Sequence, residues 1–112
     1  DWFQKGYDAY DNKEYFNAIS FYLRSIELNP DYVNAYINMG SAYKAQGNTA
    51  KAIQSYEKAI ELKPDYAKAY INLGNAYKAQ GKPELQISNY KKAAKLGHQG
   101  SQDWLEKNGY DW

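Results

Sequence analysis

Few residues in this 112-residue sequence could catalyse a reaction or bind a metal. It has no cysteine, which excludes disulfides, thiolate metal ligands and a cysteine nucleophile. Its single histidine, His98, is too little for a multi-histidine metal site. A Ser-His-Asp triad would need His98, and no serine shows the context of an activated nucleophile. We therefore interpret His98 as a turn residue, and we expect no enzymatic activity, no metal and no other cofactor.

Two other groups of residues have a simpler structural interpretation. Gly74, Gly81 and Lys82 resemble a phosphate-binding loop, but six residues separate the glycines where such a loop needs four. Glu57 and Glu61 stand one helical turn apart and could share a metal ion. We favour a solvated helix face instead. What remains for this chain is recognition through its surface.

The composition limits the partners that such a surface could bind. The formal net charge is +1, so neither a strongly basic nucleic-acid footprint nor an acidic tail is present. No run of about 18 apolar residues predicts a membrane-spanning helix. The sequence names no compartment, and we favour a cytoplasmic one. Thirteen tyrosines accompany a mean hydropathy of −0.88. Tyrosine combines an apolar ring with a polar tip, which suits thin cores and binding surfaces.

The tyrosines recur with a fixed period. Residues 33–66 and 67–100 share 16 identities in 34 positions. Residues repeated at this spacing include Tyr22, Tyr56 and Tyr90; Tyr36 and Tyr70; Tyr43 and Tyr77; and Gly40 and Gly74. Trp2 and Trp104 extend the series of Tyr36 and Tyr70. A repeat of this length indicates one supersecondary unit that stacks on its neighbours.

Each unit is predicted to contain two helices. Apolar and small residues of the first follow the i, i+3, i+4, i+7 spacing of an amphipathic helix: Ala35, Tyr36, Met39, Gly40 and Tyr43. Gly47 ends that helix, and Asn48 or Thr49 caps the next. The second helix should bury Ala52, Ile53, Tyr56, Ala59, Ile60 and Leu62. Pro64 stops it, and Asp65 is a plausible cap for the helix that follows.

The repeated positions resemble the signature of the tetratricopeptide repeat family, W-x2-L-G-x2-Y followed by A-x3-F, A and P. The second unit carries the matching residues Tyr36, Met39, Gly40, Tyr43, Ala52, Tyr56, Ala59 and Pro64. The resemblance implies an all-α, right-handed solenoid of three helix-turn-helix repeats plus a C-terminal capping helix. We expect one domain, residues 1–112, with repeats at 1–32, 33–66 and 67–98 and the capping helix at 99–112.

Five residues depart from this signature: Lys5, Ala9, Ser25, Gln86 and His98. Lys5 replaces a leucine, Ala9 a tyrosine, and His98 a proline. Gln86 puts a polar group where two helices should approach closely, so we expect looser packing in the third unit. None of the five changes the expected fold.

The resemblance also implies a concave groove, lined by the first helix of each repeat, that takes an extended peptide or a partner helix. Its positions in this chain are Phe3, Gln4, Tyr7, Tyr10, Asn34, Ile37, Asn38, Ser41, Lys44, Lys68, Ile71, Asn72, Asn75 and Lys78. Their asparagines can donate to and accept from a peptide backbone. Their three lysines favour an acidic ligand. A solubilising surface of ordinary polar residues is the alternative interpretation.

Some members of the family hold the C-terminal carboxylate of chaperone tails with five residues. Of the corresponding positions, Asn38 and Lys68 match, whereas Phe3, Tyr7 and Asn72 do not. We therefore expect no saturable binding of an acidic chaperone tail below about 100 μM, which corresponds to roughly −5.5 kcal/mol.

Two further functions are open at this stage. Aromatic residues near both ends of the chain, Trp2, Phe3, Trp104, Tyr110 and Trp112, could let copies stack end to end as a homo-oligomer. Alternatively, these rings fold back and cover the ends of their own array. Nucleic-acid binding through interleaved tyrosines and lysines is not expected, since the repeat explains most tyrosines as packing residues.

Overall fold

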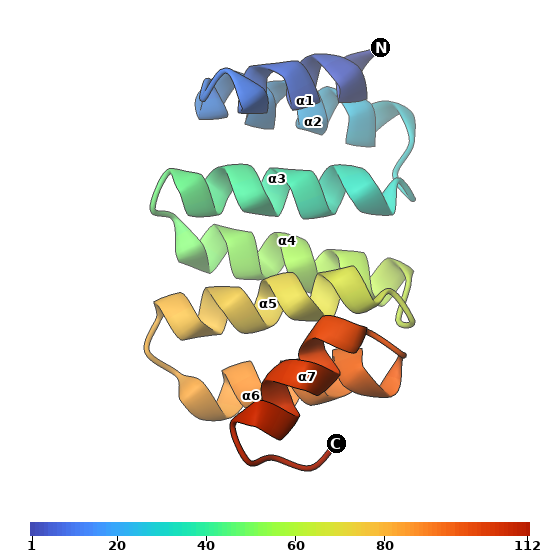
Figure 1. Ribbon diagram of the computed structural model, residues 1–112. Helices are drawn as coiled ribbons and strands as arrows, with labels where there is room; N and C mark the ends of the chain where they lie inside the picture. Colours follow the sequence, from blue (N-terminus) through green and yellow to red (C-terminus); the bar gives the residue numbers. More distant parts are fainter.

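The computed structural model describes all 112 residues, which form seven α-helices and no β-strand (Figure 1). The helices are α1 (Trp2–Asp11), α2 (Tyr15–Leu28), α3 (Val33–Ala45), α4 (Thr49–Leu62), α5 (Ala67–Ala79), α6 (Pro83–Lys95) and α7 (Gln99–Lys107). The prediction of an all-α helical solenoid is confirmed. None of the seven helices has the length and apolar character needed to cross a lipid bilayer.

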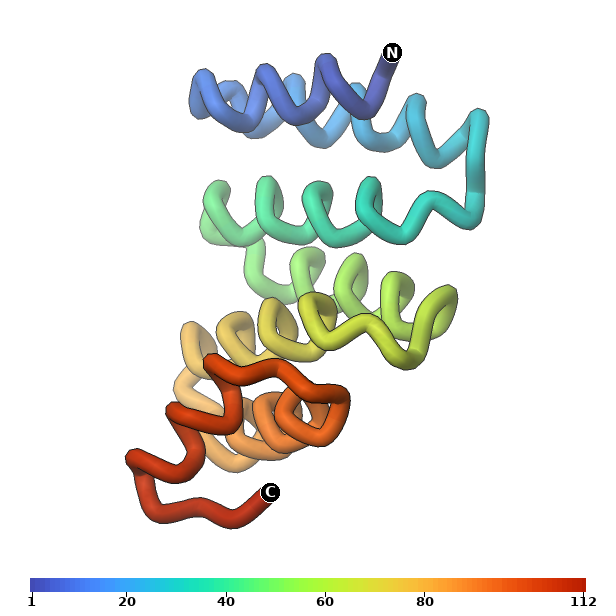
Figure 2. The backbone as a smooth tube through the Cα atoms, turned by 45° about the vertical axis from the view of Figure 1, so that its right-hand side comes forward, coloured from blue at the N-terminus to red at the C-terminus, as the bar shows by residue number.

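The first six helices form three pairs that stack in chain order (Figures 1 and 2). Within the pairs, α1 packs on α2, α3 on α4 and α5 on α6; between them, α2 contacts α3 and α4 contacts α5. The molecule is elongated, with extents of 43 × 25 × 20 Å. Each pair therefore buries its apolar side chains mainly against its immediate neighbours.

The turns within the pairs depend on left-handed backbone. Gly47 and Gly81 have φ angles of +82° and +71°, which glycine adopts without steric cost. Asn48 then caps α4, because its side chain accepts a hydrogen bond from the backbone N–H of Lys51 at 3.3 Å. This cap matches one of the two predicted from the sequence.

The link between the second and third pairs differs from those turns. Residues 63–66 join α4 to α5, and Tyr66 occupies the N-cap position without a side-chain hydrogen bond. The prediction that Asp65 caps α5 is therefore wrong. Since Asp65 precedes the N-cap position, its carboxylate is not the group that receives the first free N–H groups of the helix.

Close contacts between the paired helices explain the repeated glycines. A Cβ atom on Gly40 would lie 2.6 Å from Cε1 of Tyr56, well inside van der Waals contact. The same arrangement joins Gly6 to Tyr22 and Gly74 to Tyr90. Glycine on the first helix thus makes room for the tyrosine ring of the second, which lets the tyrosine serve as a core residue.

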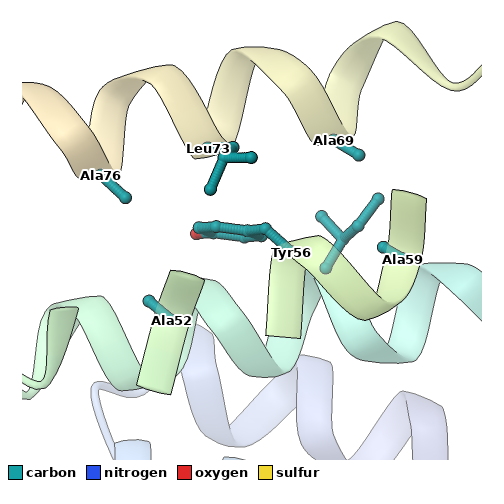
Figure 3. Packing of buried hydrophobic residues seen from close by; sticks show 7 residues of the cluster. Ala52, Tyr56, Ala59, Ala69, Leu73 and Ala76 are labelled. Atoms are coloured by element: carbon teal, nitrogen blue, oxygen red, sulfur yellow. The ribbon is translucent and has the colours of Figure 1, made fainter. Parts of the chain in front are cut away.

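The largest buried cluster lies between the second and third pairs (Figure 3). Its members are Ile37, Ala52, Tyr56, Ala59, Ala69, Leu73 and Ala76. In Figure 3 the Tyr56 ring lies between its own helix and Leu73 of α5, with alanines on both sides. These alanines let the helices approach closely, while the tyrosine ring fills the remaining space.

The last helix attaches through the kind of turn that is found within the pairs. Gly97 has φ +97°, and the N–H groups of Gly97 and His98 donate to the carbonyls of Ala94 and Ala93 at 2.9 and 3.1 Å. Helix α7 consequently turns back over α6 and crosses it obliquely (Figure 2). Leu105 of α7 is fully buried and clusters with Tyr90 and Ala94 of α6.

The polar departure in the third pair does not leave an unsatisfied group. Gln86 is buried, yet no buried side-chain nitrogen or oxygen in the molecule lacks a hydrogen-bond partner. The neighbouring Tyr90 is 9% exposed, compared with 2% for Tyr56. The third pair is thus slightly less enclosed than the second.

Candidate functional site

Two of the side chains that suggested catalysis or metal binding, His98 and Glu61, have structural partners. His98 caps α7: its Nδ1 accepts a hydrogen bond from the N–H of Ser101 at 3.0 Å. Glu61 forms the only salt bridge of the chain, with Lys58 at 3.4 Å. No three His, Cys, Asp or Glu side chains lie close enough together to hold a metal ion.

A cavity of about 250 Å³ opens on the face formed by α1, α3 and α5. Its lining residues are Tyr7, Tyr10, Asp11, Tyr22, Asn38, Ser41, Lys68 and Asn72. They come from the first helix of every pair and, through Tyr22, from α2. A ligand in this cavity would therefore touch all three pairs at once.

A second hollow, of about 360 Å³, adjoins the first. It is lined by Tyr10, Ser41, Lys44, Ala45, Tyr56 and Asn72. The two hollows share three of these residues, Tyr10, Ser41 and Asn72. We call the surface lined by both sets the groove.

Tyrosine hydroxyls in the groove are hydrogen-bond donors at neutral pH. Burial raises the pKa of Tyr22 to about 12, although a hydrogen bond from Asn38 acts in the opposite direction. Burial, together with the nearby Tyr15 and Asp11, also raises the pKa of Tyr10. Both phenols stay protonated, so they add no negative charge to the groove.

Three of the polar residues predicted for the groove, Ser41, Asn34 and Asn75, are already engaged within the protein. The Ser41 hydroxyl lies 3.1 Å from that of Tyr56. The Tyr66 hydroxyl donates to Oδ1 of Asn34 at 2.8 Å, and Tyr90 donates to Oδ1 of Asn75. These polar groups position their helices as well as facing outward. Asn72, which also lines both hollows, has no side-chain hydrogen bond within the protein and is available to a ligand.

The structure brings together half of the fourteen predicted groove residues. Those in the two hollows are Tyr7, Tyr10, Asn38, Ser41, Lys44, Lys68 and Asn72. Gln4, Asn34, Asn75 and Lys78 lie outside the hollows. Phe3 packs inward, with its ring stacked on that of Tyr32 at a centroid distance of 4.7 Å.

The two isoleucines do not face the groove. Ile37 is 1% exposed and belongs to the central cluster, so its assignment as a ligand-facing residue is wrong. The cause is the next pair, because residues of α5 cover this position. Ile71 occupies the equivalent position on α5 and lines a separate hollow beneath α7, with Tyr90 and Trp104.

Sequence reasoning missed two residues of the first cavity, Asp11 and Tyr22. The repeat predicts Tyr22 as a core residue, and its ring is indeed buried, but its polar end reaches the cavity. The sequence alone could have identified Asp11, because the equivalent positions of the other repeats are Ala45 and Ala79. A charged residue where the other units have alanine marks a difference in function or in packing.

Three family sequence profiles match the chain. One, described as a TPR repeat, covers residues 40–81, and two described as tetratricopeptide repeats cover residues 21–54 and 67–96. Together they account for the continuous stretch 21–96. No curated protein sequence matches significantly.

Solved structures with the same fold include a crystal structure of MamA, at 32% identity and a TM-score of 0.83. This match covers 90% of the chain but only 59% of the MamA chain. The first TPR of Spaghetti (RPAP3), bound to the HSP90 peptide SRMEEVD, is 26% identical with a TM-score of 0.85 and coverages of 95% and 86%. The Sgt2 TPR domain from Aspergillus fumigatus is 27% identical with a TM-score of 0.85 and coverages of 95% and 73%.

Proposed function

Because the chain belongs to the tetratricopeptide repeat family, we propose that it is a non-catalytic module that binds another protein. The ligand is an extended peptide or a helix of the partner, and it lies in the groove. The chain spans about three fifths of the MamA chain, so this proposal concerns the repeat module.

The observation that carries the proposal is the origin of the residues in the first cavity. Tyr7 comes from α1, Asn38 from α3, and Lys68 and Asn72 from α5. Neighbouring pairs converge on one hollow that the packing of the helices does not fill. Amides and hydroxyls beside apolar ring surface suit a peptide, whose backbone needs hydrogen bonds and whose side chains need apolar contact.

The peptide-bound Spaghetti (RPAP3) domain is a precedent for peptide binding by this fold, but its peptide is not the ligand that we propose. Its peptide, SRMEEVD, has three acidic residues among its last four. Of the five clamp positions that the family resemblance implies, this chain matches only Asn38 and Lys68, and Phe3 is turned inward. We therefore propose a different ligand, and we expect chaperone tails to show no saturable binding below about 100 μM.

A mapped titration tests the proposal. Peptides selected from a random library for binding to the chain would be added to labelled protein, and backbone amide shifts recorded by NMR. We expect shifts concentrated in α1, α3 and α5, and loss of binding in a variant carrying Asn38→Ala, Lys68→Ala and Asn72→Ala. The matched control carries Asn17→Ala and Lys95→Ala, both exposed and outside the groove. Shifts confined to α2 and α4 would contradict the proposal.

Self-association is the second candidate function, supported by exposed apolar groups near the C-terminus. Leu96, Tyr110 and Trp112 keep about two fifths of their surface exposed. The other terminal rings are folded back: Trp2 stacks on Phe21 at 6.0 Å, and Trp104 meets the ring of Tyr90 edge-on at 5.0 Å. A monomer mass that stays constant across a sedimentation concentration series would exclude this candidate.

A further inference from the structure

The first cavity of the groove contains one acidic and one basic side chain. Asp11 lies on the α1 wall and Lys68 on the α5 wall, and α3 separates the two walls (Figure 1). Neither residue forms a salt bridge, since the only one in the molecule joins Lys58 to Glu61. Both are exposed, so both charges are free to meet a ligand.

The α1 wall suits a cationic side chain. Tyr7 is 49% exposed and Tyr10 is half-buried, and both line the cavity beside Asp11. A guanidinium or ammonium group over the face of an aromatic ring gains a cation–π interaction. An arginine could also donate two hydrogen bonds to the Asp11 carboxylate, because its planar group matches the two carboxylate oxygens.

The α5 wall suits a carboxylate. Lys68 supplies a positive charge, and the side-chain amide of Asn72, one helical turn further along α5, can donate hydrogen bonds in the same cavity. Positive charge continues into the second hollow through Lys44. The electrostatic character of the groove thus changes from negative at α1 to positive at α3 and α5.

From this charge arrangement we infer that the ligand is a bipolar peptide segment, with a basic side chain toward Asp11 and an acidic side chain toward Lys68. The inference rests on the proposed function and specifies the partner. In the peptide, the basic and the acidic residue lie within about four positions of each other. The reason is that both walls belong to one cavity and an extended chain advances about 3.3 Å per residue. A uniformly acidic segment would place a negative charge next to Asp11, and a uniformly basic one would place a positive charge next to Lys68. Repulsion between like charges opposes binding in both cases.

Four peptides on a common glycine–serine–alanine background test the inference, each acetylated and amidated so that its termini carry no charge. Two contain one arginine and one glutamate three residues apart, in opposite orders; a third has two glutamates and a fourth two arginines. We expect one bipolar peptide to bind at least about tenfold more tightly than both uniformly charged ones, measured as Kd by calorimetry. The preferred order gives the direction in which the peptide crosses the helices.

Variants that remove one charge show which charged residue of the peptide contacts Asp11 and which contacts Lys68. Asp11→Asn should weaken the bipolar peptide severalfold and strengthen the two-glutamate peptide, whereas Lys68→Gln should strengthen the two-arginine peptide. The matched controls are Asp31→Asn and Lys95→Gln, whose side chains are exposed away from the groove; they should leave all four Kd values unchanged.

The outcomes separate this inference from the proposed function. If the two-glutamate peptide binds in the groove as tightly as either bipolar one, the inference is wrong and peptide binding in the groove still stands. If none of the four peptides binds, the inference is also wrong. The proposed function fails only when the library-selected peptides, too, leave the amides of α1, α3 and α5 unshifted.

Discussion

Ile37 and Ile71 are the same residue at the same position of consecutive repeats, yet they have different surroundings. Ile37 is buried in the central cluster, whereas Ile71 is half-buried and lines a hollow of about 170 Å³. The difference comes from the helix that follows each pair. Helix α5 stacks directly on the second pair, while α7 crosses α6 obliquely (Figure 2). The hollow beneath α7 leaves Ile71 only half-buried.

The connections explain why α5 and α7 pack differently. Four residues, 63–66, join α4 to α5, but only three, 96–98, join α6 to α7. The shorter connection has the hydrogen bonds and the left-handed glycine of the turns within the second and third pairs. The comparison shows that the burial of a repeat position depends on the next helix as much as on its own residue. Three predictions test this contrast between the central pairs and the C-terminal end, and a fourth tests the burial of Tyr22 in the first pair.

The largest effect is expected at Tyr56, in the centre of the array. Tyr56→Ala removes a ring that is 2% exposed and should lower the free energy of unfolding by about 3–5 kcal/mol. Tyr90→Ala should cost about 1 kcal/mol less, because the less enclosed third pair can relax into the space. Urea unfolding followed by circular dichroism measures both. Equal losses would show that the two regions are packed equally well.

The isoleucine pair tests the contrast directly. Ile37→Ala should cost about 2–4 kcal/mol, whereas Ile71→Ala should cost less than about 2 kcal/mol, since its side chain already borders a hollow. Both unfolding free energies come from the same urea titrations. If Ile71→Ala is as costly as Ile37→Ala, α7 covers the third pair as completely as α5 covers the second.

Unfolding at alkaline pH tests the burial of Tyr22 in the first pair. Since folding raises the pKa of Tyr22 from 10 to about 12, the unfolded chain loses this proton first as the pH rises. Stability from this group is complete below pH 10 and falls between pH 10 and 12, by at most about 3 kcal/mol. Urea midpoints measured across this range should fall less steeply in Tyr22→Phe. A slope in Tyr22→Phe as steep as that of the wild type would contradict the assignment.

The smallest effect is expected where α7 begins. His98→Ala removes the side chain that caps this helix and should cost about 1 kcal/mol, whereas His98→Asn should restore most of it because asparagine caps well. Amide exchange in α7 and urea unfolding report the change. An asparagine variant as unstable as the alanine variant would show that His98 stabilises α7 by packing and not by capping.

Much of this fold could be predicted, because the same packing contacts recur in each repeat. Gly40 and Tyr56 contact each other as their recurrence suggested, and the turn at Gly47 forms where glycine was expected. Errors arose where a residue depends on something outside its own helix. The spacing of apolar residues could not tell whether Ile37 faces a ligand or the next pair, since both surfaces lie on the same side of the helix.

The candidate site was only partly predictable for the same reason. Positions such as Asn38 and Lys68 follow from the repeat, because every first helix presents the same face. Asp11 does not follow from it, since it differs from the repeated residue. The departure of α7 from the stacking of the pairs is set by a turn one residue shorter, which changes the path of the chain without changing the apolar pattern.

The neighbour-to-neighbour stacking also has a kinetic consequence. Contacts between helices that are adjacent in sequence dominate the molecule, so little chain entropy is lost before each new contact forms. Folding can start in any one pair and spread to the next, and the ends open before the middle does. A peptide that bridges α1, α3 and α5 would act as a clamp on this opening and delay the loss of the terminal pairs.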